Sequence, residues 1–196
     1  MRSLLIGAVS VVVAGLGFSQ FEGPPAGPRI TDEPPAGVRP PQAPPLSPPA
    51  RTSLSLDGQK ITIKYSAPSV RKRVIFGGLV PYNQVWRAGA NDATLLHTSA
   101  DLEFKGLVVA KGDYSLFLWP DPQQWQLIIN QETRQSGLEY HQERDLVRVA
   151  MDMSRPPKPV ETYKITLTKT GATEGQLKMA WENTVATAGF VVRAPR

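Results

Sequence analysis

The side chains best suited to chemistry lie between Arg73 and Asp92, in the stretch RVIFGGLVPYNQVWRAGAND. The candidate ligand-binding residues in this stretch are Arg73, Tyr82, Trp86, Arg87, Asn91 and Asp92. The rings offer apolar faces to a sugar ring or a cation. The guanidinium groups can bind a carboxylate or a phosphate, and the amide and carboxylate pair a donor with an acceptor for hydroxyl groups. Because Gly77, Gly78 and Pro81 make an irregular, restrained loop, the stretch predicts a site for a small polar ligand or a cell-envelope glycan.

A structural interpretation of the same residues competes with the binding site. In this alternative the chain is a structural or protein-interaction domain, and the loop motif only stabilises the fold. The segment Gly89–Asp92 is typical of a turn, in which Asn and Asp hydrogen-bond their own backbone. Trp86 then anchors the core, and Arg87 becomes the buried partner of Asp92, five residues further along the chain. For Arg87 itself we favour this structural pairing, with Trp86 and Tyr82 nearer any pocket.

A hydrolase is the enzymatic alternative, with Asp92 acting beside a distant acid or histidine. A glycosidase needs two carboxylates across a cleft. The acids available are Asp92, Asp101, Glu103, Asp113, Glu139 and Glu143, and no spacing pairs any two of them. No Gly-x-Ser-x-Gly motif occurs. The sequence therefore favours binding without catalysis and identifies no catalytic residue.

The sequence gives little support for a metal site. His97 and His141 are the two histidines, and with Asp92 they could supply three ligands. Their separation matches no recognised ligand spacing, and the chain has no cysteine. We therefore expect no bound metal and no cofactor.

The first nineteen residues are typical of a secretory signal. Arg2 supplies the positive charge, Leu4–Leu16 is apolar, and Gly17 and Ser19 are the small residues expected before a cleavage site. Cleavage before Gln20 would leave no stable membrane insertion, whereas an uncleaved segment would act as a membrane anchor. We expect an exported protein, periplasmic or extracellular.

Residues 20–50 are predicted to be a disordered linker. Eleven of the nineteen prolines fall between Phe21 and Ala50, and such a composition favours extended chain and cannot build a core. A single domain is therefore expected over residues 51–193, which is long enough to bury a sizeable core.

The formal charge of +5 is mildly basic, but it does not indicate nucleic-acid binding. The basic residues form one short run, Arg71–Arg73, and a nucleic-acid site needs a concentrated patch with stacking rings. An exported basic domain suits the anionic polymers of a cell envelope better. The oligomeric state cannot be read from the sequence.

The predicted domain is all-β. Asp57-Gly58 lies between two alternating segments and predicts a hairpin that pairs Leu54 with Ile61 and Leu56 with Gln59. Further extended segments are expected at 73–76, 94–98, 102–104, 107–109, 114–119, 124–129, 146–153, 160–168, 176–181 and 184–192, with one helical turn at 83–87 and a long loop or short helix at 130–144. Short strands with frequent turns and no long amphipathic helix predict an antiparallel β-sandwich or jelly roll of nine or ten strands.

The chain resembles a bacterial family known as domain of unknown function 2911. The resemblance is densest in RVIFGGLVPY (Arg73–Tyr82) and VWRAGAND (Val85–Asp92), and continues through GDYSL (Gly112–Leu116), Trp125 and Trp181. The family pattern usually has Thr at position 88 and Glu at position 92, where this chain has Ala88 and Asp92, so the carboxylate here has a shorter reach. The resemblance implies an exported all-β domain and no established activity.

Overall fold

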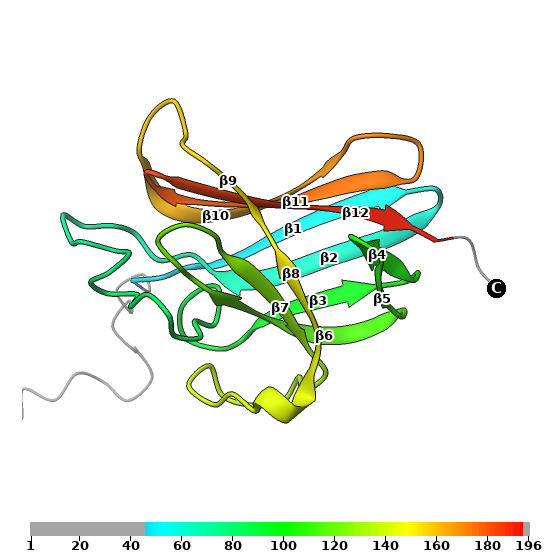
Figure 1. Cartoon of the computed structure of the whole chain (residues 1–196), viewed down its shortest axis with the longest axis horizontal. Helices are drawn as coiled ribbons and strands as arrows, with labels where there is room; N and C mark the ends of the chain where they lie inside the picture. The colour runs from blue at the N-terminus through cyan, green and yellow to red at the C-terminus, as the bar shows by residue number, and fades with distance from the viewer. Residues whose placement is uncertain (1–45, 194–196) are drawn as a thin grey trace, which may run out of the picture. The chain divides into compact units, whose positions relative to one another are not determined.

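The computed structural model of the chain describes residues 46–193 (Figure 1). The predicted signal peptide and residues 20–45 of the predicted linker lie outside the described residues. Among residues 46–193, no helix is long and apolar enough to cross a membrane.

Two antiparallel sheets face each other in a β-sandwich, as the alternating sequence pattern predicts (Figure 1). The first sheet contains, in spatial order, β1 (Pro49–Leu56), β2 (Gln59–Ser66), β3 (Thr94–Thr98), β6 (Gly112–Trp119), β7 (Gln126–Asn130) and β8 (Asp145–Ala150). The second contains β10 (Val160–Lys169), β11 (Glu174–Glu182), β12 (Thr184–Val192), β4 (Leu102–Phe104) and β5 (Leu107–Val109), with β9 (Asp152–Ser154) paired to β12. A single 3-10 turn, η1 (Gln142–Arg144), precedes β8.

The described residues form twelve strands, where the sequence predicted nine or ten. The predicted strand 146–153 is divided between the sheets. Its first half, β8, pairs with β7, and its second half, β9, pairs with β12. The buried Met151 lies at the corner, where its N–H donates to the carbonyl of Trp125. The start of the domain also differs from the prediction. β1 begins at Pro49, two residues before the expected domain boundary at residue 51.

The core lies between the two sheets and is filled by alternate residues of each strand. The opening hairpin has the predicted register, with Leu54 opposite Ile61 and Leu56 opposite Gln59. Its inward face is also as predicted: Leu56, Ile61 and Ile63 are buried, and Leu54 and Tyr65 lie against them. The opposing face of β10 and β11 contributes Tyr163, Ile165, Leu167, Leu177, Met179 and Trp181.

The turn of this hairpin supports a first prediction. Gly58 has a φ of 71°, a backbone conformation that is unfavourable for any residue with a side chain. A Cβ at this position would contact no other atom. Gly58→Val is therefore expected to lower the free energy of unfolding by about 1 kcal/mol or more, measured by urea denaturation. Gly189→Val is the matched control, because Gly189 also has open space around it but no positive φ. Equal midpoints for the two variants would contradict the strain at Gly58.

Candidate functional site

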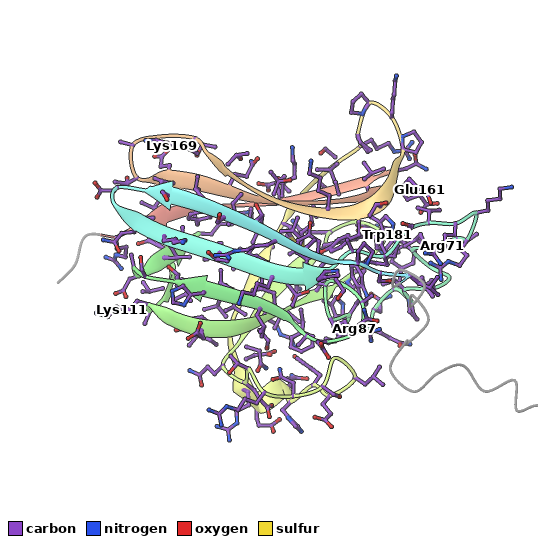
Figure 2. The ribbon with its side chains drawn as sticks, turned by 180° about the vertical axis from the view of Figure 1, so that it is seen from behind. Arg71, Arg87, Lys111, Glu161, Lys169 and Trp181 are labelled. Carbon is purple, nitrogen blue, oxygen red and sulfur yellow. The ribbon has the colours of Figure 1, made fainter. Side chains whose placement is uncertain are left out.

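The loop of residues 67–93 connects β2 to β3 at one end of the sandwich and makes backbone hydrogen bonds to strands of both sheets. On one side, the N–H of Tyr163 in β10 donates to the carbonyl of Pro68. On the other, Trp86 exchanges two backbone hydrogen bonds with Leu118 in β6, of 2.8 and 2.7 Å. Figure 2 shows Arg87 and Trp181 at this end of the sandwich, with Lys111 at the opposite end. The loop is thus held by both sheets, which suits it to position side chains.

Two local predictions for this loop are wrong. Residues 73–76 are not a strand, because the chain turns back on itself there and Val80 donates its N–H to the carbonyl of Ile75. The turn requires Gly78, since a side chain on this residue would meet the carbonyl oxygen of Val74 at 2.6 Å. Residues 83–87 are not a helical turn, because Trp86 is drawn into extended pairing with β6.

An aromatic cluster fills the space under the loop. Trp86 stacks on Trp181, with ring centroids 5.7 Å apart and an angle of 18° between the planes, and meets the edge of Tyr163 at 5.2 Å. Phe76 packs edge-on against Trp181 at 6.0 Å and against Trp125 at 4.5 Å. Trp86 remains half-exposed, whereas Trp181 is buried. One tryptophan of the stacked pair therefore reaches the surface, and the other supports it from below.

A pocket of about 250 Å³ opens beside this pair, and we name it the Trp86 pocket. It is lined by Ser47, Pro68, Arg73, Leu79, Val80, Trp86, Arg87, Gly89, Ala90 and Trp181. Among these lining residues none is a carboxylate or a histidine. The walls thus combine two tryptophans and several aliphatic groups with two guanidinium groups.

Arg87 does not form the predicted ion pair with Asp92. Among residues 46–193 no ion pair includes Arg87, and Asp92 is exposed and does not line the pocket. The Nη1 of Arg87 donates instead to the carbonyl of Gly137, at 3.4 Å, and its buried Nε has no partner among the described residues. The physical reason is the neighbouring loop: a Cβ on Gly137 would overlap the carbonyl oxygen of Asn91, so the glycine backbone packs directly onto this segment.

Arg73, the second guanidinium of the pocket, is held by its own loop. Its Nε donates to the carbonyl of Val70 at 3.1 Å, and its Nη2 donates to the carbonyl of Ser69 at 2.7 Å. These two bonds fix the plane of the group and leave its other N–H groups free of acceptors among the described residues.

The structure therefore brings three of the six candidate residues, Arg73, Trp86 and Arg87, to one pocket. The other three lie outside its lining. The ring of Tyr82 packs on Gly77, the exposed Asn91 donates to the carbonyl of Ser47 at 3.3 Å, and Asp92 faces solvent. Trp181, a buried core residue of β11 that was not among the six candidates, also lines the pocket.

The loop of residues 131–144, which carries Gly137, is fastened to the first sheet by polar contacts. The side chain of Asn130 donates to the carbonyl of His141 at 2.9 Å. The hydroxyl of Tyr140 donates to Asp145 at 2.6 Å, and Arg148 donates to the same carboxylate at 2.8 Å. Burial and the hydrogen bond to Asp145 raise the pKa of Tyr140 to about 12, so this hydroxyl stays a donor at neutral pH. The contact between Gly137 and Arg87 thus rests on a well-held loop.

The two histidines bind separate carboxylates. His97 lies 2.8 Å from Asp113, and His141 lies 2.6 Å from Glu132, Nδ1 to carboxylate oxygen in both pairs. Within residues 46–193, no group of three metal-ligating side chains comes together. His97, His141 and Asp92 therefore form no cluster of this kind among these residues.

The second pair supports a prediction about pH. The hydrogen bond to Glu132 and the charge of that carboxylate raise the pKa of His141 above its ordinary value of 6.5. The pair therefore stabilises loop 131–144 fully at pH values below the ordinary pKa of histidine. This stabilisation is lost as the pH rises through the raised pKa of His141, because the folded state is the one in which the pKa is raised. An NMR titration should place the midpoint of His141 above 6.5 and show Glu132→Gln lowering it. An unchanged midpoint in that variant would contradict the pairing.

Comparison with known proteins identifies a family. A family model described as "Protein of unknown function (DUF2911)" matches residues 47–190, which confirms the resemblance seen in the sequence. Neither the curated proteins nor the solved structures include a match to this chain.

Proposed function

The chain belongs to this DUF2911 family, whose description gives no activity, and we propose that its β-sandwich binds a small polar ligand without catalysing a reaction. The binding site in this proposal is the Trp86 pocket. The sequence of the predicted signal peptide, and not the structure, supports the further proposal that binding takes place outside the cytoplasm. The apolar stretch after Arg2 is the feature that supports export.

The observation that supports binding most strongly is the state of Arg87. A guanidinium cannot lose its charge at physiological pH, and a half-buried one needs an acceptor or water. Arg87 makes one long hydrogen bond, and its Nε is buried without a partner among the described residues. A residue that only stabilised the fold would be expected to have a carboxylate partner. A cation that has no carboxylate partner among residues 46–193, beside a partly exposed tryptophan, supports a binding site here.

The hydrolase alternative gains no support from the pocket. It depended on Asp92, which faces solvent and does not line the pocket. General acid-base catalysis needs a titratable group within reach of the reacting atoms. The described lining supplies aromatic, aliphatic and guanidinium groups instead, and these suit recognition.

A thermal-shift screen of the full chain against sugars, organic anions and divalent metal salts tests this proposal. A ligand present at about 100 times its Kd stabilises the folded state by about 2.7 kcal/mol, which raises the Tm by several degrees. We expect such a shift with at least one compound class. Ala90→Leu should abolish it by filling the pocket that Ala90 lines.

Ala110→Leu is the matched control for Ala90→Leu, since it makes the same change at an exposed residue outside the pocket lining. This control should keep the full ligand-induced shift. A screen with no shift, or a shift that survives Ala90→Leu undiminished, would contradict the proposed function.

A further inference from the structure

We infer that the ligand of the Trp86 pocket is an organic anion, with a carboxylate or phosphate head and an apolar, ring-sized body. This inference rests on the proposed function and narrows it to one chemical class. It also sets aside a neutral glycan as the ligand of this pocket.

The charge of the lining determines the head group. Arg73 and Arg87 both line the pocket, and no carboxylate does so among the described residues. The nearby acid Glu161 accepts from the backbone N–H of Arg71, at 2.9 Å, and is not among the lining residues either. A neutral ligand would cover two cations that have no anionic partner among the described residues, which is costly. An oxyanion would supply the missing acceptors.

The geometry of the two guanidinium groups suits an oxyanion. Arg73 is fixed by two carbonyl acceptors, through Nε and Nη2, and offers its remaining N–H groups. Arg87 is held by one acceptor, through Nη1, and because its Nε is buried, only its terminal N–H groups are left for a ligand. Guanidinium N–H groups match the oxygens of carboxylate and phosphate, and donors that are already held in place lose less entropy on binding.

The remaining walls determine the body of the ligand. Pro68, Leu79, Val80, Trp86 and Trp181 supply apolar surface on the same cavity. Leu79 is 49 % exposed, so apolar surface extends to the mouth of the pocket. An inorganic ion would leave this surface in water, whereas a ring or a short hydrocarbon would cover it and gain affinity from the apolar area removed from water. The cavity of about 250 Å³ limits that body to a small one.

Carboxylate and phosphate share the chemistry that the two arginines recognise, so the test includes both. Isothermal titration of the full chain at low ionic strength compares benzoate with benzamide, and phenyl phosphate with inorganic phosphate. Benzoate is expected to bind at least about tenfold tighter than its neutral amide. Phenyl phosphate is expected to bind at least about tenfold tighter than inorganic phosphate, because only the former has an apolar body. The affinity for both organic anions should fall as salt is added.

The outcomes separate this inference from the proposed function. Equal affinities for benzoate and benzamide would overturn the anionic head, and equal affinities for the two phosphates would overturn the apolar body. If a neutral sugar raises the Tm in a manner abolished by Ala90→Leu while no organic anion binds, the proposed function stands and this inference is wrong. If nothing binds in the pocket, both are wrong.

Discussion

Replacing Trp181 with alanine is expected to lower the free energy of unfolding by about 3–5 kcal/mol, the largest stability effect predicted for this chain. Trp181 is 1 % exposed and contacts three other rings, those of Phe76, Trp86 and Tyr163. Its indole N–H also donates to the carbonyl of Glu161 at 3.3 Å. The substitution removes the inner wall of the Trp86 pocket and leaves a cavity between the sheets. Urea denaturation measures the loss.

Trp119→Ala is the matched control for this large effect. Trp119 is half-exposed, and its ring has the guanidinium of Arg148 at 5.9 Å. Its removal is expected to cost no more than about 2 kcal/mol. If Trp181→Ala unfolded at the midpoint of the parent protein, the aromatic cluster would not be the core element described here.

Arg87→Met is expected to reduce the affinity for benzoate or phenyl phosphate by at least about tenfold, because charge-assisted hydrogen bonds contribute about 1.5–3 kcal/mol each. The same variant should change the free energy of unfolding by less than about 1 kcal/mol. Methionine keeps most of the apolar stem that packs on Gly137 and removes a charge that has no carboxylate partner among residues 46–193. Titration calorimetry and urea denaturation measure the two effects separately.

Arg71→Met is the control for the charge itself. Arg71 is a neighbouring exposed cation whose Nη2 donates to the carbonyl of Leu46, and it is not part of the pocket lining (Figure 2). The Arg71→Met variant should leave the affinity for the organic anion within about twofold of the parent value, apart from the small effect of net charge. A stability loss of about 3–5 kcal/mol in Arg87→Met, with unchanged affinity, would restore the structural interpretation in which Arg87 is a buried ion-pair partner.

The parts of the fold that were predictable from the sequence are those set by neighbouring residues. The turn at Asp57-Gly58 fixes the register of β1 and β2, and alternation then fixes which side chains face the core. The hairpin of β4 and β5 has the predicted bounds for the same reason, with Gly106 in its turn at a φ of 86°. In these segments, local turn chemistry and the hydrophobic pattern agree.

The errors fall where distant contacts decide the backbone. Nothing near Trp86 in the sequence shows that it pairs with Leu118 in β6, and this contact replaces the predicted helical turn. Similarly, the corner at Met151 depends on Trp125, which a sequence pattern cannot locate in space. The strand 146–153 was therefore predicted as one element and divides between two sheets.

The candidate site was predictable in its residue types and not in its partners. The sequence indicated that Trp86 and Arg87 belong together in a special loop. It could not show that Arg87 turns toward Gly137, fifty residues away, and leaves Asp92 in solvent. It also could not show that Trp181 from β11 forms the wall under Trp86. The direction of a loop side chain depends on the elements packed around it, and those come from elsewhere in the chain.

The most direct test of the binding site is an NMR titration of the full chain with phenyl phosphate, following the indole N–H signals of its four tryptophans and the Nε–H signals of its arginines. We expect saturable shifts at Trp86, Trp181 and the Nε–H of Arg87, with no shift at Trp119 or Arg148. Shifts confined to Trp119 and Arg148, or no saturable shift at Trp86 and Arg87, would contradict a ligand site in the Trp86 pocket.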